Sequence, residues 1–154
     1  MSEIALLAPV PLVHLKDGLE VCTSKGKVAF GSRAWEVFRE LDDLRAGAKV
    51  PVLIYASMSN SDGPAAISWQ AEYIGHLESK NGAHPAGMEF RPPSTAEYNS
   101  DNLGWWAVFW EVSGLREIPA NEQITVESIQ SRSGQFYKPS FIPEGPIIVQ
   151  NPWR

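Results

Sequence analysis

The stretch Val50-Pro-Val-Leu-Ile-Tyr-Ala-Ser57 decides the fold, because it is a continuous apolar run with β-branched and aromatic residues. Such a run is typical of a strand that is buried on both faces of a sheet. A second strand is predicted at 66–78, where apolar and polar residues alternate with a period of two. Trp105-Trp-Ala-Val-Phe-Trp-Glu-Val112 predicts a third strand, on which Trp105 and Trp106 would point to opposite faces.

The flanking segments predict two helices and further short strands. Apolar residues recur at helical spacing over 12–22, with Gly26 as the stop, and over 32–46, where Ser32 would act as N-cap. The short apolar runs are 4–8, placed at a sheet edge because prolines follow it, 125–129 and 147–149. The fold class is therefore α+β, a single domain over 1–154. We expect a small mixed or antiparallel β-barrel of about five or six strands with two or more helices packed against it.

The composition is that of a folded chain, with 44% hydrophobic and 20% charged residues among 154. The single cysteine, Cys22, excludes an internal disulfide framework and indicates a reducing, cytoplasmic setting. No apolar run approaches the roughly 18 residues that a membrane span needs, so we expect no membrane partner. The net charge of −5 argues against broad nucleic-acid binding, which requires a basic face, but not against a pocket that takes one base.

The spacings that mark common catalytic, metal and cofactor sites are missing. There is no G-x-G-x-x-G after a strand, no G-x-S-x-G and no H-E-x-x-H, and the three histidines are dispersed. His76 and Glu78 could hold a metal from one strand face, but a solvated polar face is the favoured interpretation. We therefore predict no catalytic residue, no metal ligand and no cofactor.

Two features favour a ligand site. Residues 79–104 are rich in Gly, Pro, Asn and Ser, and a loop of that length in a compact domain is usually functional. The chain also has six tryptophans, and aromatic rings stack on unpaired bases at about 1–3 kcal/mol per base. We expect at least one tryptophan in a pocket, with packing in the core as the alternative for each.

Several segments, taken in order, carry a family resemblance. They are Leu6-Leu-Ala-Pro-Val-Pro11, His14-Leu-Lys-Asp-Gly18, Phe30-Gly-Ser-Arg-Ala34, Arg45-Ala-Gly-Ala-Lys-Val-Pro-Val-Leu-Ile-Tyr-Ala-Ser57, 67–77, and Trp106-Ala-Val-Phe-Trp-Glu-Val-Ser-Gly-Leu-Arg-Glu-Ile-Pro119. Their order over 4–130 resembles an EVE domain of the PUA-like superfamily. The chain departs from that family in the first strand, which lacks the usual tryptophan, at Ala34, where an asparagine is usual, and at Ala48, where an aspartate is usual. An ASCH-like relative is the alternative.

The resemblance implies a PUA-like barrel with a pocket between the barrel and its helices, which relatives use for modified bases in DNA or RNA. Carried over by position, the ligand-binding residues would be Ser32, Arg33, Tyr55, Ser57 and Trp69. The predicted strand at 105–112 adds Trp105 and Trp106 as a further wall.

Three functions fit these observations. The leading one is a noncatalytic module that holds a nucleobase, modified or not, of DNA, RNA or a free nucleoside in an aromatic pocket. The second is a small ASCH-like hydrolase of a modified nucleoside, for which Thr23, Lys25 and Glu111 are the available candidates, with Glu111 favoured as a surface residue. The third is a protein-interaction subunit that exposes tryptophans at an interface.

Overall fold

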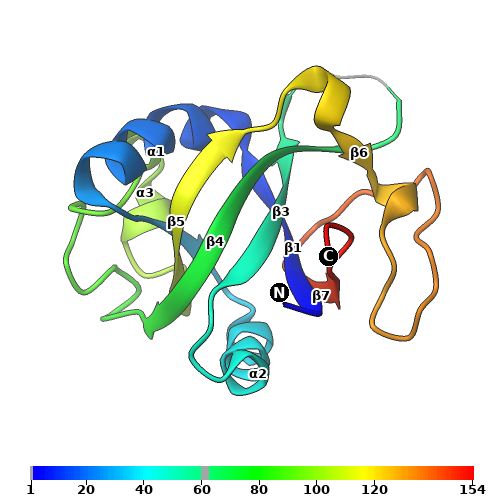
Figure 1. Cartoon of the computed structure of the whole chain (residues 1–154). Helices are drawn as coiled ribbons and strands as arrows, with labels where there is room; N and C mark the ends of the chain where they lie inside the picture. The colour runs from blue at the N-terminus through cyan, green and yellow to red at the C-terminus, as the bar shows by residue number, and fades with distance from the viewer. Residues whose placement is uncertain (1, 60–62) are drawn as a thin grey trace.

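The structure, a computed structural model, describes residues 2–59 and 63–154. One mixed sheet of seven strands has the order β2-β5-β4-β3-β1-β7, with β6 paired to β4 (Figure 1). The strands are β1 (Ile4–Pro11), β2 (Val28–Ser32), β3 (Val50–Ser57), β4 (Ala66–Glu78), β5 (Val108–Glu117), β6 (Ile124–Thr125) and β7 (Ile147–Gln150). The helices are α1 (Leu12–Lys25), α2 (Trp35–Arg45) and the short α3 (Asn99–Asn102), with 3-10 turns η1 (Pro93–Glu97), η2 (Ala120–Glu122) and η3 (Val126–Ser128).

Strand β3 is central, because it pairs in parallel with β1 and antiparallel with β4. Its residues alternate between two cores, with Val52 and Ile54 in the larger and Leu53 in the smaller. The larger core includes Leu6, Leu15, Phe38, Tyr73 and Trp110, and the smaller includes Leu7, Ile67, Ile118, Ile129 and Val149. The prediction that 50–57 is a strand buried on both faces is confirmed.

Strand β4 bends the sheet. Its first half alternates between buried and partly exposed residues, which confirms the predicted period of two. Its pairing with β5 changes register after Gln70 and again after Tyr73, and such bulges increase the bend and twist of a strand. The sheet therefore curls into a half-barrel, which confirms the predicted α+β class and is consistent with the predicted small β-barrel (Figure 1).

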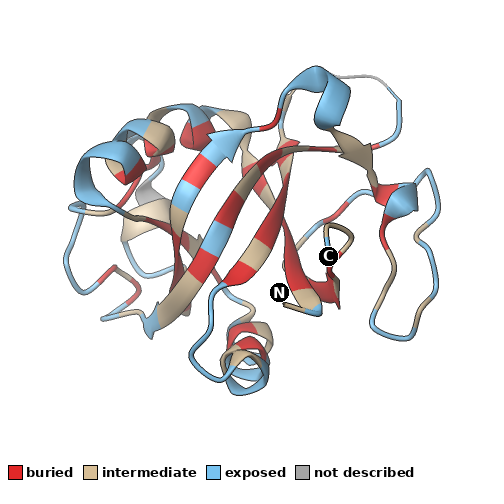
Figure 2. Cartoon of the chain, in the orientation of Figure 1, coloured by how far each residue is buried: buried red, intermediate tan, exposed pale blue. Residues whose placement is uncertain are grey.

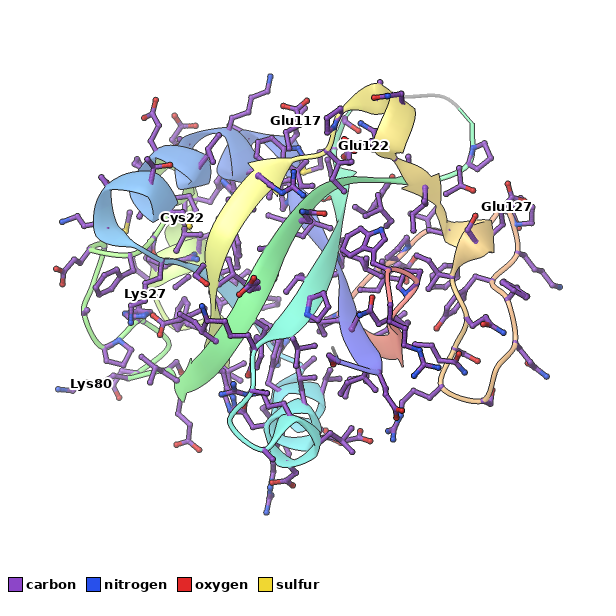
Figure 3. All side chains as sticks on the ribbon, viewed as in Figure 1. Cys22, Lys27, Lys80, Glu117, Glu122 and Glu127 are labelled. Carbon is purple, nitrogen blue, oxygen red and sulfur yellow. The ribbon has the colours of Figure 1, made fainter. Side chains whose placement is uncertain are left out.

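The two long helices contribute to the larger core, and their outer surfaces are exposed (Figure 2). Helix α1 lies along β5, with Cys22 Sγ 3.9 Å from the carbonyl oxygen of Val112 (Figure 3). It ends as predicted at Gly26, whose φ of 86° is left-handed. Helix α2 buries Phe38, whose ring lies 6.0 Å from that of Tyr73. None of the helices in the described ranges has the length and hydropathy that crossing a bilayer requires.

Two strand predictions need correction. The run at 4–8 is not at an edge, because β1 lies between β3 and β7 and sends alternate residues into both cores. Of the predicted strand at 125–129, only Thr125 lies in a strand, the two-residue β6, since the chain turns into η3 at Val126.

Helix α2 and strand β5 also start later than predicted. Ser32 is not the N-cap of α2: it ends β2, and its Oγ accepts a 3.0 Å hydrogen bond from the N–H of Ala34, the residue before the helix. Strand β5 begins at Val108, so Trp105 and Trp106 precede it. The alternation that would have separated these two side chains therefore does not apply.

Candidate functional site

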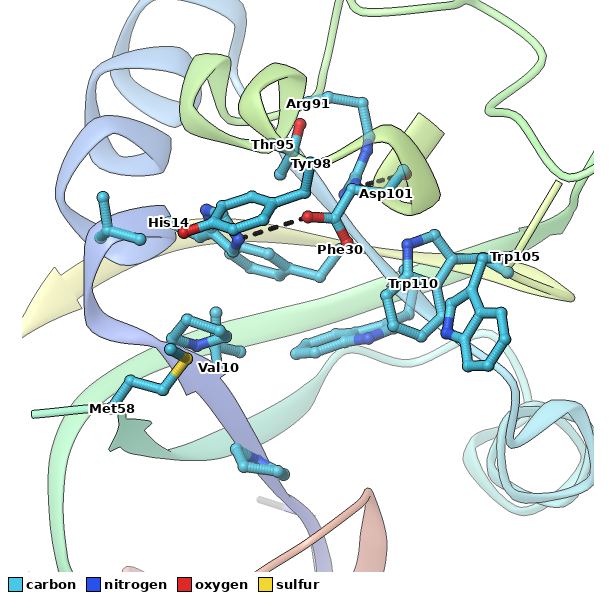
Figure 4. Close-up of a pocket in the computed structure, with 15 residues that line it drawn as sticks. Val10, His14, Phe30, Met58, Arg91, Thr95, Tyr98, Asp101, Trp105 and Trp110 are labelled. Carbon is cyan, nitrogen blue, oxygen red and sulfur yellow. Dashed lines mark hydrogen bonds and ion pairs between the residues drawn. The ribbon is translucent and has the colours of Figure 1, made fainter. Parts of the chain in front are cut away.

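A cavity of about 340 Å³ opens on the face that carries the larger core, at the start of α1 (Figure 4). The end of β1, the first turn of α1, β2, β5 and the segment 91–106 enclose it. Its aromatic residues are Phe30, Tyr98, Trp105, Trp106 and Trp110, and its polar side chains are His14, Arg91, Thr95 and Asp101. This size falls within the range of about 300–1,000 Å³ that is usual for small-ligand sites.

The floor of the cavity is set by strand pairing. Phe30 of β2 lies opposite Trp110 of β5 in the antiparallel register, and their ring centroids are 5.0 Å apart. The Trp106 indole packs against Gly31, the next residue of β2, where a β-carbon would collide with the ring. Trp106 Nε1 is buried and has no hydrogen-bond partner among the described residues.

Arg91 holds in place the cavity wall that residues 91–102 form. Its side chain is buried, and it donates from Nη1 to the carbonyl oxygen of Ala29 (2.8 Å) and from Nη2 to that of Asp101 (3.0 Å). Its Nε donates to Asn102 Oδ1 at 3.1 Å. Burial lowers the pKa of Arg91 to about 10, an effect that the Asp101 carboxylate partly opposes. The guanidinium thus joins residues 91–102 to β2.

A buried polar cluster anchors an earlier part of the loop, at His84. The Glu111 carboxylate lies 3.1 Å from Lys27 Nζ and 3.2 Å from His84 Nε2, and both Glu111 and His84 are buried. The prediction that Glu111 is a surface residue is therefore wrong. Glu111 belongs to a closed ion-pair cluster that holds the loop onto β5, and it does not line the cavity.

The polar end of the cavity is built around His14 in the first turn of α1. His14 Nδ1 lies 2.7 Å from Ser94 Oγ, and Nε2 lies 3.6 Å from Asp101 Oδ2 (Figure 4). Asp17 lies behind Ser94 and accepts hydrogen bonds from its N–H (2.6 Å) and its hydroxyl (2.8 Å). Burial lowers the pKa of His14, against the raising effect of Asp101.

Four of the seven predicted ligand-binding residues lie at this site or next to it. Trp105 and Trp106 line the cavity. Ser32 and Arg33 line an adjoining cavity of about 320 Å³, which shares Trp106 with the first. The Arg33 guanidinium lies 4.6 Å from the centre of the Trp105 ring.

The other three lie outside the residues that line the cavity. Trp69 is 3% exposed and packs in the larger core, because its alternation on β4 turns it inward. Tyr55 packs against the smaller core. Ser57 ends β3, and the residue after it, Met58, lies at the cavity with a left-handed φ of 57° and 82% exposure.

The geometry does not assemble a hydrolytic centre from the predicted candidates. Thr23 and Lys25 are exposed on α1, whereas Glu111 is buried on β5. Ser94 lies near His14, but its hydroxyl donates to Asp17 and it does not line the cavity. From the sequence, His76 with Glu78 is a possible metal ligand. Its Nδ1 instead lies 2.6 Å from Oδ2 of Asp42 on α2, a contact that holds α2 on β4.

Sequence reasoning missed the polar residues His14, Arg91 and Asp101 and the aromatic residues Phe30 and Tyr98. The one signal for three of them was the length of the loop at 79–104, which indicated function without indicating which side chains turn inward. No model of a known protein family matches this chain, and no curated protein matches it either.

Proposed function

We propose that this chain is a noncatalytic module that binds one nucleobase in the cavity between β2, β5 and the segment 91–106. The observation that carries the proposal is a cavity of about 340 Å³ with aromatic side chains on several sides and buried polar groups at one end. Aromatic walls stack on the faces of a base, and polar groups at one end contact its edge.

The aromatic side chains suit a flat ligand. Trp105 is 51% exposed at the cavity, so a ligand that stacks on it would cover apolar surface now open to solvent. Trp106 Nε1 is a buried donor without a partner in the described part of the chain, and a carbonyl or ring nitrogen of a ligand would satisfy it.

The adjoining cavity suits the rest of a nucleotide. It is lined by Ser32 and Arg33 and continues past Trp106, so a base in the first cavity would leave its sugar and phosphate near the Arg33 guanidinium. Arginine pairs with phosphate through two parallel N–H groups. One such contact needs no basic face, which agrees with the net charge of −5.

We also propose that the chain is an EVE-like domain of the PUA-like superfamily. A curled mixed sheet with a helix directly after β1 and another after β2 is compatible with a PUA-like barrel of the EVE type. The position of the cavity, between the sheet and the start of α1, supports this proposal.

The test is a titration of the intrinsic tryptophan fluorescence with the four common nucleoside monophosphates, in the parent chain, Trp105→Ala and Trp35→Ala. Trp35 is the matched control, because it is 47% exposed on α2 and does not line the cavity. We expect saturable quenching, weakened by about 1–3 kcal/mol in Trp105→Ala and unchanged in Trp35→Ala. The absence of saturable quenching with every nucleotide, or equal losses in both variants, would contradict the proposal.

A further inference from the structure

The Asp101 carboxylate is a largely buried acceptor at the wall of the cavity. Its side chain is 15% exposed, and no hydrogen bond to either carboxylate oxygen occurs among the described residues. Among the described residues, the ionisable side chain nearest to it is His14, whose Nε2 lies 3.6 Å from Oδ2, longer than a hydrogen bond. Because this carboxylate opens into the cavity, a ligand there would supply the hydrogen-bond donors that a largely buried carboxylate needs.

The hydrogen-bond chain behind His14 makes its Nε2 a second acceptor. The Ser94 hydroxyl donates to Asp17 Oδ1 at 2.8 Å, a shorter contact than its 3.4 Å approach to the carbonyl oxygen of Val13. Ser94 Oγ therefore accepts from His14 Nδ1–H at 2.7 Å. A neutral imidazole that donates through Nδ1 carries its lone pair on Nε2.

Burial supports the neutral form of His14. Burial is the largest effect and lowers its pKa, and Arg91 lowers it further, whereas Asp101, Asp17 and Glu97 raise it. The edge of Tyr98 packs against the ring, with centroids 5.8 Å apart. Near neutral pH the polar end of the cavity thus offers an acceptor on Asp101 and an acceptor on His14.

Three of the five N–H groups of Arg91 are used within the protein. Its three recorded hydrogen bonds all go to the protein, to Ala29, Asp101 and Asn102. The Thr95 hydroxyl likewise donates to the carbonyl oxygen of Pro92 at 2.7 Å.

We propose that Asp101 and His14 select a base with two adjacent N–H donors on one edge, as guanine has in its ring N1–H and its 2-amino group. A carboxylate accepts two such donors side by side. Adenine and cytosine place a ring acceptor beside the amino group, which would face the carboxylate lone pairs. Hypoxanthine keeps the ring N–H but lacks the amino group. This selectivity rests on the proposed function, since it assumes that a base occupies the cavity.

The experiment compares GMP, IMP and AMP by calorimetry in the parent chain, Asp101→Asn and Asp43→Asn. GMP and IMP differ only in the 2-amino group. Asp43, exposed on α2, is the control for loss of one negative charge. We expect the parent chain and Asp43→Asn to bind GMP roughly ten- to hundredfold more tightly than IMP, the range for a hydrogen bond to a charged group. In Asp101→Asn this ratio should fall to within about twofold of one, because an amide presents only one acceptor.

The ratio is measured within each variant, so a partial loss of folded protein does not change it. Equal binding of GMP and IMP by the parent chain, tighter binding of AMP, or an unchanged ratio in Asp101→Asn would overturn the selectivity while leaving the cavity as a base site. If none of the nucleotides binds the parent chain, the proposed function and this inference are both overturned.

Discussion

The indole of Trp106 packs directly on the backbone of Gly31, so closely that a β-carbon on residue 31 would collide with Cδ1 and Nε1 of the ring. Gly31 has no left-handed φ, so it is the space taken by the indole that requires glycine there. Trp106 lines both cavities. The contact therefore fixes the wall that the proposed base and sugar-phosphate sites share.

Gly31→Ala is expected to displace Trp106 and weaken nucleotide binding. Overpacking of this kind costs about 1–3 kcal/mol of unfolding free energy, measurable by urea denaturation. The double variant Gly31→Ala with Trp106→Leu tests the cause, because removing the indole should remove most of the penalty. Additive losses in the double-mutant cycle would show that the indole is not what excludes the β-carbon.

Truncation of two tryptophans should separate binding from stability. Trp69→Ala should lose about 3–5 kcal/mol of unfolding free energy, because the side chain is 3% exposed in the larger core. Trp105→Ala should change the urea midpoint little, because its side chain is 51% exposed. The same denaturation series checks both, and a collapse of the Trp105→Ala transition would assign that residue to packing instead.

Removal of the Arg33 guanidinium should weaken the binding of nucleotides more than that of nucleosides. Arg33 is exposed and lines the adjoining cavity, so Arg33→Ala should lower the affinity for a monophosphate roughly five- to tenfold and leave nucleoside affinity nearly unchanged. The slope of log affinity against log salt concentration should also decrease by about one, the value for one phosphate contact. Arg39→Ala, on the exposed face of α2, is the control, and equal effects of both variants would argue against a phosphate at Arg33.

Acidification should destabilise the fold through His14. Burial lowers the pKa of His14 in the folded chain, so the unfolded chain, with a pKa of about 6.5, binds more protons at this residue. The free energy of unfolding should therefore fall as the pH drops below about 6.5. His14→Gln should flatten this dependence, and an unchanged slope between pH 5 and 7 in the variant would show that His14 is not its source.

The sequence predicts the elements whose burial follows a regular period, and it predicts much less of the site. Strands β3 and β4 and helix α1 follow from apolar spacing alone. Strand β2 is not predicted, because its five residues include Gly31 and show no clear alternation. Asp101 is placed near His14 by Arg91, which reaches the carbonyl oxygen of Ala29 across 62 positions of sequence. Contacts between residues so far apart in the chain leave no local pattern in the sequence.

The two tryptophans at 105 and 106 show the same limit. Their residue type led us to predict a pocket wall, but the predicted strand would have placed them on opposite faces. Both line the cavity because β5 begins at Val108, after the chain has left the long loop.

The indole N–H resonances of the ¹⁵N-labelled chain, followed during titration with the four common nucleoside monophosphates, report directly whether a base enters the cavity. The six tryptophans give six such signals, assigned with single Trp→Phe variants. We expect saturable chemical-shift changes for Trp105, Trp106 and Trp110, which line the cavity. We expect little change for Trp35, Trp69 and Trp153, which do not line it. Signals that none of the nucleotides shifts, or shifts confined to the second group, would contradict a base site in this cavity.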